Sequence, residues 1–163
     1  MKVYHGGFTE VSEPKILEPS HSMDFGNGFY VTTDLKQAKK WSLIKKDRFH
    51  YKKAVVSVFE MDDMIFKTAD LKTKVFHDAN EEWLDFVMAN RQNIQFTYDY
   101  DAVMGAVAND NVYASLNLYE QGFLGKKELL EELMTWKYVD QICFHTEKAL
   151  KYLQFIKSEE VSK

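Results

Sequence analysis

The sequence predicts a fold of the α+β class, in which strands and helices follow one another in mixed order. Ala54–Met61 alternates in character and is rich in Val, which is typical of a strand. Lys126–Trp136 carries Leu129, Leu130 and Leu133 at the spacing of an amphipathic helix. Because strands and helices do not alternate regularly, a doubly wound parallel sheet describes this chain less well.

Short apolar segments are expected to supply the other strands. They lie at residues 2–5, 29–32, 102–107 and 138–145. The two prolines, Pro14 and Pro19, both fall between Ser12 and Ser22, and this segment is expected to be an irregular loop.

Polar residues mark where the other helices begin. Thr33 or Asp34 can cap a first helix that runs to about residue 46. A second helix is expected from Asn80 to near Arg91, with acidic residues first and a basic one last, as the helix dipole favours. Thr146 can cap a final helix, which apolar spacing extends through Leu150, Leu153 and Ile156.

The composition indicates one ordinary globular domain spanning residues 1–163. Hydrophobic residues make up 45% and charged residues 28%, which argues against a largely disordered chain. Aromatic residues reach 15%, enough for a bulky core and also for a cleft that stacks on flat rings. The net charge of −4 gives no general attraction to nucleic acid. Basic pairs such as Lys45-Lys46 are interpreted as a solvated helix face, with a local polyanion contact as the less favoured alternative.

Some kinds of site are not expected. Cys143 is the only cysteine, which excludes an internal disulfide and a Cys-rich zinc site. No cluster of His, Cys and carboxylates has metal-ligand spacing, so no metal is expected. The first residues do not read as a signal peptide and no apolar run approaches membrane-spanning length, so we expect a soluble, cytoplasmic protein with no membrane partner.

Three short stretches carry residues whose side chains or backbone groups could bind a ligand. They are residues 5–7 (His-Gly-Gly) at the end of a strand, 26–30 (Gly-Asn-Gly-Phe-Tyr) at a turn before a strand, and 140–142 (Asp-Gln-Ile) at the head of a late strand. Taken singly, each is more simply a turn or a strand end than a ligand site. Strand alternation sends Asp140 and Gln141 to opposite faces, so both cannot face one cleft unless the strand starts between them.

Taken in order, these stretches resemble the signature of the ADP-ribosyltransferase superfamily, in the branch that uses His, Tyr and an acidic residue. The first matches its His-Gly strand end, and the second its Gly-x-Gly-hydrophobic-Tyr strand, followed by the Lys-x-Ala helix start at residues 36–38. The third matches its late strand, with Gln141 where the catalytic Glu is expected. More narrowly, residues from about Tyr4 to Leu153 look like the bacterial DUF3990 type, whose pattern includes Trp83, Asn90, Arg91, Asp101, Gly105, Asn109 and Asp110.

The resemblance implies a split β-sheet core with flanking helices and NAD as co-substrate. It implies that His5 hydrogen-bonds a ribose, that the backbone of Gly6 meets the carboxamide, and that Tyr30 stacks on the nicotinamide ring. Trp41 lies near the place of a second stacking aromatic, and Arg91 is a candidate for reaching the pyrophosphate. Departure of nicotinamide creates an oxocarbenium-like centre, which a carboxylate normally stabilises.

Gln141 departs from this pattern because an amide cannot neutralise a cation or accept a proton. Asp140 or Asp110 is then a candidate for supplying the charge, with Asp101 as a further acidic neighbour. Asn109 and Asp110 lie in an Asn-Asp-Asn run that is typical of an exposed turn, and the alternative places them at the cleft mouth, where they contact the acceptor.

The favoured function is therefore a slow mono-ADP-ribosyltransferase or an NAD glycohydrolase, with His5, Tyr30 and Gln141 as its catalytic set and an unspecified macromolecular acceptor. The resemblance also implies the toxin of a bacterial toxin–antitoxin pair, with a small antitoxin protein as partner. The alternative is a catalytically inactive module that binds NAD or ADP-ribose. A third, weaker interpretation is an interaction domain with an aromatic docking surface.

Overall fold

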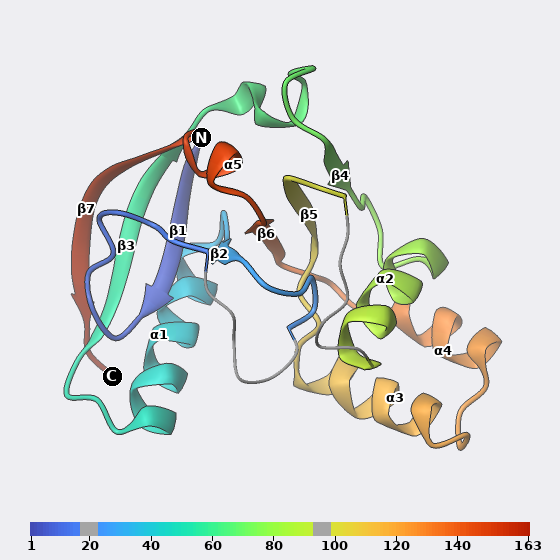
Figure 1. Ribbon diagram of the computed structural model, residues 1–163. Coiled ribbons are helices and arrows are strands. Elements are labelled where there is room, and N and C mark those ends of the chain that lie inside the picture. The colour runs from blue at the N-terminus through green and yellow to red at the C-terminus, as the bar shows by residue number, and fades with distance from the viewer. Residues whose placement is uncertain (17–22, 93–98) are drawn as a thin grey trace.

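In the computed structural model, two β-sheets pack face to face and helices cover their outer faces (Figure 1). The structure describes residues 1–16, 23–92 and 99–163. The first sheet is three-stranded and antiparallel, in the order β1 (Lys2–Gly7), β3 (Ala54–Met61) and β7 (Leu153–Val161). The second sheet is four-stranded, in the order β2 (Phe29–Val31), β6 (Asp140–Phe144), β5 (Ala102–Ala106) and β4 (Thr73–Val75). The predicted α+β class is confirmed.

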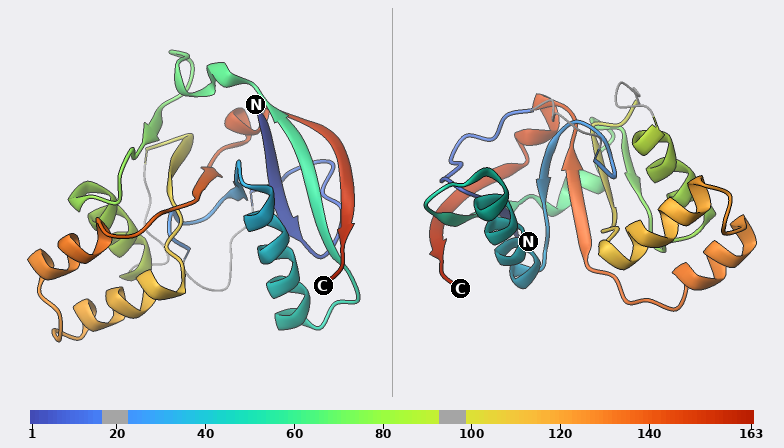
Figure 2. Two further views of the ribbon diagram at one scale, coloured as in Figure 1. Left: turned by 180° about the vertical axis from the view of Figure 1, so that it is seen from behind. Right: turned by 90° about the horizontal axis from the view of Figure 1, so that it is seen from below.

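Helices lie on the two outer sides of this pair of sheets. Helix α1 (Leu35–Phe49) packs on β1 and β3 of the first sheet, whereas α2 (Glu81–Gln92), α3 (Asp110–Glu120) and α4 (Lys126–Leu133) gather beside the second sheet, as the view from behind shows (Figure 2). The short elements are the 3-10 turn η1 (Asp63–Phe66) and α5 (Glu147–Leu150). None of the described helices is both long and apolar enough to cross a membrane.

Strand alternation divides the buried side chains of the second sheet into two sets. Phe29, Val31, Ile142 and Phe144 point toward the first sheet, where they meet Val3, Phe59 and Met61. Val103 and Cys143 point the other way and pack beneath α2, α3 and α4 with the buried Trp83. Burial of two separate apolar faces therefore holds the second sheet between the first sheet and the helices.

A single backbone bridge links the two sheets at β1 and β2. Tyr4 and Thr32 exchange hydrogen bonds of 2.8 and 2.9 Å through their backbone N–H and C=O groups. Beyond this bridge, the described pairings of β1 continue only with β3. The sheets therefore part between β1 and β2, and we call this region the β1–β2 split.

Most predicted elements are confirmed, some with shorter bounds. The strand at 54–61 is as expected. Of the two candidates Thr33 and Asp34, Asp34 caps α1 by accepting from Gln37 N, and Thr146 caps α5 as expected by accepting from Ala149 N. The proposed loop at 12–22 is described only as far as residue 16, and residues 17–22 lie outside the described part of the chain.

The prediction of a long final helix is wrong. Helix α5 ends at Leu150, and residues 153–161 form β7, which pairs with β3 over its whole length through a β-bulge between Val58 and Phe59. Leu153 and Phe155 reach the core between the sheets. The hydrogen-bonding edge of β3 overrides the helical spacing because its backbone groups need partners.

The predicted turn at 109–111 is also wrong. Asn109 caps α3 by accepting from the backbone N–H of Val112 at 3.1 Å, and Asp110 lies exposed in the first helical turn. Asn and Asp favour both turns and helix N-caps, so the residue types alone did not distinguish the two.

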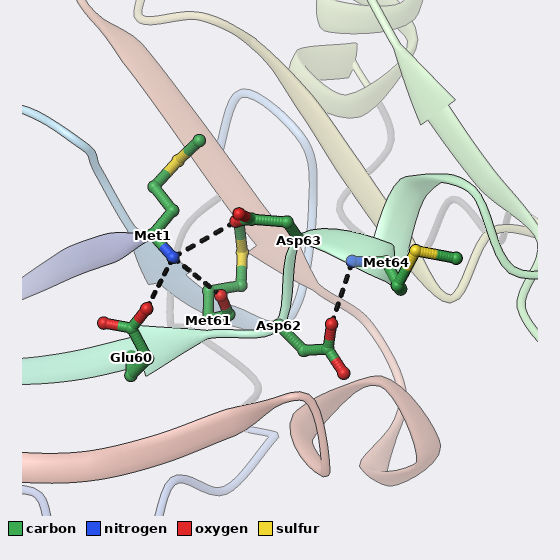
Figure 3. A network of polar contacts seen from close by, with 6 residues as sticks. All are labelled: Met1, Glu60, Met61, Asp62, Asp63 and Met64. Atoms are coloured by element: carbon green, nitrogen blue, oxygen red, sulfur yellow. Dashed lines mark hydrogen bonds and ion pairs between the residues drawn. The ribbon is translucent and has the colours of Figure 1, made fainter.

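The end of the first sheet is fastened at the chain's amino group (Figure 3). The Met1 ammonium donates to Glu60 Oε1 at 2.7 Å and to the Met61 carbonyl at 3.0 Å, and it lies 3.1 Å from Asp63 Oδ1. These carboxylates raise the pKa of the amino group. Because the groups are exposed, water screens the ion pairs and their net stabilisation is small.

Helix α1 approaches β1 so closely that position 6 has room only for glycine. A Cβ on Gly6 would lie 2.2 Å from the carbonyl oxygen of Ala38 and 3.0 Å from the backbone nitrogen of Ser42. Both atoms belong to the helix backbone, so relief would require the whole helix to move.

We therefore predict that Gly6→Ala lowers the free energy of unfolding by about 1–3 kcal/mol, the usual range for overpacking. Gly7→Ala is the matched control, since its Cβ would lie 3.5 Å from the nearest atom, His5 Nε2. Urea unfolding of both variants checks this. Equal stability of the two variants would show that the helix contact at Gly6 does not limit the packing.

Candidate functional site

The candidate site is built where β2 runs between β1 and β6. Tyr4 of β1 bridges to Thr32, and Tyr30 of β2 stands opposite Cys143 of β6 in antiparallel register. The view from below shows β2 alongside β6 (Figure 2). All three stretches that the sequence singled out thus meet on adjacent strands, although more than a hundred residues separate the second from the third.

His5 lies at the edge of β2 that faces the β1–β2 split. Its Nδ1 is 2.7 Å from the Tyr30 carbonyl oxygen, and its ring stacks on Phe29 with centroids 4.4 Å apart. Because a carbonyl only accepts, we assign the proton to Nδ1, which leaves Nε2 as a hydrogen-bond acceptor. Burial, together with the charge of Lys45, lowers the pKa of His5 to about 3, so the imidazole is neutral near pH 7.

Gly6 turns its backbone groups toward the same split. Gly6 and Tyr4 are two residues apart in one strand, so their N–H and C=O groups point to the same side, and those of Tyr4 bond Thr32. The Gly6 carbonyl accepts a 2.8 Å hydrogen bond from Lys45 Nζ. One of the two backbone groups predicted to meet a carboxamide is therefore already engaged by a cationic side chain.

Tyr30 points away from the split, toward α2–α4, and holds a turn. Its hydroxyl donates to the Gly26 carbonyl at 2.6 Å and accepts from the backbone N–H of Phe25 at 3.1 Å. Burial raises the pKa of this hydroxyl, so it stays protonated. The ring packs against the cluster beneath the helices, on the opposite face of β2 from His5 and Phe29.

Gln141 is buried on the same face as Tyr30, and it binds a carboxylate that sequence reasoning missed. Its Nε2 donates to Asp24 Oδ2 at 3.0 Å and to the Ala106 carbonyl at 3.3 Å. Asp24, only 5% exposed, also accepts from Tyr113 Oη at 2.5 Å and from the backbone N–H of Ala108 at 3.0 Å. Burial raises the pKa of Asp24 despite these donors. In the sequence, Asp24 stands directly before Phe25 and Gly26, and this position at the start of a turn was the available signal.

Asp140 faces the other way from Gln141, as strand alternation requires. Its carboxylate accepts from the Thr33 backbone N–H at 2.8 Å and from Thr32 Oγ1 at 3.3 Å, and the Thr33 hydroxyl also donates to it. The residue is half-buried. It lies on the β6 face of Ile142 and Phe144, which is also the face on which His5 stacks against Phe29.

An open cavity of about 730 Å³ reaches Asp140 from the side of α4. Its walls come from residues 75–81, from β5 and from the segment between α4 and β6. Trp136, Tyr138 and Phe76 make much of the lining aromatic. Of the candidate site residues, Asp140 lines this cavity.

The remaining sequence-predicted residues lie elsewhere. Arg91 joins α2 to α3 through Glu120 Oε1 at 2.9 Å and Asn117 Oδ1 at 2.7 Å, and its guanidinium lies 4.6 Å from the centre of the Tyr113 ring. Its described contacts therefore lie between α2 and α3, on the face of the second sheet opposite His5.

Four further side chains lie elsewhere in the fold. Asn109 and Asp110 form the start of α3, and Asp101 accepts from Thr146 Oγ1 at 2.8 Å and from Lys72 N at 2.8 Å. Trp41 lies half-buried on α1, three residues after Ala38. The structure therefore brings together His5, Gly6, Tyr30, Asp140 and Gln141, but divides their side chains between two faces. Within the described residues, no group of three His, Cys, Asp or Glu side chains is arranged to hold a metal ion.

Two half-buried histidines, His5 and His145, are expected to make the stability of the fold sensitive to acid. His145 Nδ1 is 2.7 Å from the Asn27 carbonyl, and burial lowers its pKa to about 4, as burial lowers that of His5 to about 3. When the pKa of a histidine is lower in the folded than in the unfolded state, the unfolded chain binds protons first as the pH falls. The protein is therefore more stable above pH 6.5, and its stability declines as the pH falls toward the folded-state pKa. Each histidine should lower the free energy of unfolding by about 2 kcal/mol between pH 7 and pH 5.

We therefore expect the free energy of unfolding to fall between pH 7 and pH 5, and His5→Gln to flatten this fall. The exposed His77 supplies the control variant, His77→Gln, which should keep the wild-type pH profile. The raised pKa of Asp24 makes the folded state more stable as the pH falls, which opposes the effect of the histidines. Urea unfolding of each variant beside the wild type therefore isolates the contribution of His5. Identical slopes for wild type and His5→Gln would contradict the assignment of a neutral His5.

The comparisons with known proteins agree with the narrower of the two resemblances. No curated protein and no solved structure matches the chain. The family described as "Protein of unknown function (DUF3990)" matches residues 1–155. Because that match covers nearly the full length of the sequence, the chain belongs to the DUF3990 family.

Proposed function

We propose that this protein cleaves NAD, releases nicotinamide, and transfers the ADP-ribosyl group to a single acceptor or to water. The observation that carries the proposal is the meeting of β1, β2 and β6, with His5 against the Tyr30 carbonyl and Asp140 at the head of β6. These strands bear the three motifs that resemble the ADP-ribosyltransferase signature, and they are neighbours in space, since β2 pairs with β6 and is bridged to β1. The superfamily's split-sheet fold is part of the same proposal.

Asp140, rather than Gln141, is the carboxylate that this proposal assigns to the reaction. It shares a face with His5 and touches an open cavity, whereas Gln141 is 4% exposed and engaged with Asp24. The bond between the ribose C1′ and the nicotinamide nitrogen breaks, and its electron pair leaves with nicotinamide. A nearby Asp140 carboxylate would stabilise the positive charge that develops at C1′. The acceptor then forms the new bond to C1′ and loses a proton.

The other residues have supporting roles in this scheme. Neutral His5 offers Nε2 to a ribose hydroxyl, because its Nδ1 is occupied by the Tyr30 carbonyl. Gln141 acts as a positioning residue that keeps Asp24 and the Asp24–Gly26 turn in place. The cavity that reaches Asp140 gives an acceptor a route to the reacting carbon. A toxin role with a small antitoxin partner belongs to the same proposal and rests on the resemblance alone.

A module that binds NAD or ADP-ribose without turnover is the second candidate. One observation favours it: Gln141, at the place where the resemblance expects a catalytic Glu, is a neutral amide that is buried and engaged with Asp24. Saturable binding of NAD without release of nicotinamide would select this candidate.

The test is nicotinamide release from NAD by the purified protein, with NAD binding measured by calorimetry alongside. Asp140→Asn keeps the shape of the side chain and removes its charge, so we predict a rate lower by about 10²–10³ and an NAD affinity within about threefold of wild type. Asp110→Asn removes an exposed carboxylate from the start of α3 and should release nicotinamide at the wild-type rate.

Thermal unfolding must accompany these assays, because Asp140 also holds Thr33. Equal rates for Asp140→Asn and wild type would remove Asp140 from the chemistry. A wild-type protein that neither binds nor cleaves NAD would overturn the proposed function altogether.

A further inference from the structure

A lysine ammonium lies in the β1–β2 split, and no carboxylate in the described part of the chain pairs with it. The Lys45 side chain leaves α1 and returns to β1, where its Nζ donates to the Gly6 carbonyl at 2.8 Å. The residue is half-buried, and the ammonium is its deeper end. Among the described residues, no Asp or Glu lies within ion-pair distance of this Nζ, and Lys45 has three N–H donors, of which the Gly6 carbonyl takes one.

Two exposed lysines contrast with this arrangement. Lys53 pairs with Glu160 at 3.5 Å and Lys163 pairs with Asp47 at 3.0 Å, both on the exposed surface. Lys45 instead has Arg48 as its charged neighbour, and burial together with that charge lowers the pKa of Lys45 to about 8. A buried ammonium that is not paired destabilises a protein, so an anionic ligand is the chemistry that would complete this site.

The position of this charge connects it to the proposed site. Lys45 donates to the backbone carbonyl of Gly6, the residue next to His5, and its positive charge contributes to the lowered pKa of the His5 imidazole. The split therefore combines a neutral hydrogen-bond acceptor, inward-facing backbone groups and a positive charge that no carboxylate of residues 1–16, 23–92 or 99–163 pairs. A sugar flanked by phosphate presents hydroxyl groups and negative charge, the two chemistries that these groups can bind.

We propose that Lys45 binds the diphosphate of a dinucleotide, holding NAD in the β1–β2 split beside His5. This inference rests on the proposed function, because NAD is the ligand it assigns. The competing explanation is structural: Lys45 merely supplies a donor to the Gly6 carbonyl. The two explanations differ in whether the charge itself is required.

The experiment measures the binding of three probes by calorimetry: NAD, nicotinamide riboside, which lacks the diphosphate, and inorganic pyrophosphate. Lys45→Met should weaken the binding of NAD and of pyrophosphate by about ten- to a hundredfold, the usual loss for a charged hydrogen bond. Its affinity for nicotinamide riboside should stay within about twofold of wild type. Lys46→Met, on the next residue of α1 and turned about 100° around the helix, should leave all three unchanged.

Two conservative variants separate charge from structure. Lys45→Arg keeps the charge and should restore NAD affinity to within about threefold, whereas Lys45→Gln keeps a neutral donor and should behave like Lys45→Met. Recovery of NAD binding by Lys45→Gln would show that the hydrogen bond to Gly6 is the only role and would overturn the proposal. Thermal unfolding of each variant identifies any that fail to fold.

The outcomes also separate this inference from the proposed function. Wild-type binding of NAD that Lys45→Met leaves intact overturns the Lys45 assignment and leaves NAD cleavage standing. Binding of pyrophosphate that depends on Lys45, with no binding of NAD, supports the anion site and overturns the proposed function. Absence of binding to NAD and to pyrophosphate overturns both.

Discussion

The junction between the two sheets is the constraint on which the rest of this structure depends. One backbone bridge between Tyr4 and Thr32 joins β1 to the end of β2, and directly beyond it Asp140 of β6 gathers the hydroxyls of Thr32 and Thr33 and a backbone N–H. Asp34, the next residue, caps α1. The end of one strand thus fixes two sheets and a helix within three residues, and His5, Gly6 and Lys45 acquire their positions from it.

Close backbone approach and burial then give this junction its chemical character. The carbonyl of Ala38 lies against Gly6, which brings α1 near enough for Lys45 to reach the Gly6 carbonyl. Burial makes His5 a neutral acceptor and leaves Lys45 as the nearest positive charge. The same compactness excludes Arg91 from the split, because α2 and α3 cover the far face of the second sheet.

Features set by neighbouring residues could be predicted from the sequence, whereas features set by distant partners could not. Asp34 and Thr146 were recognised as caps because a cap acts within three residues. The strand β7 was taken for a helix because its partner, β3, lies about a hundred residues earlier in the chain. Asp24 went unnoticed because its donors come from Ala108, Tyr113 and Gln141, and Lys45 was placed on a solvated face because only the fold reveals Gly6 above it.

The Asp24–Gly26 turn has a thermodynamic consequence for anything that binds against Tyr30. Tyr30 and Gln141 together hold this turn by three hydrogen bonds, so a ligand that needs the Tyr30 hydroxyl must select a conformation in which the turn has been released. The measured affinity is then the intrinsic affinity multiplied by the population of that released state. Each 1.4 kcal/mol by which the turn favours its closed position would weaken the apparent affinity of such a ligand about tenfold, whereas a ligand held in the β1–β2 split, on the other face of β2, would not have to displace the turn.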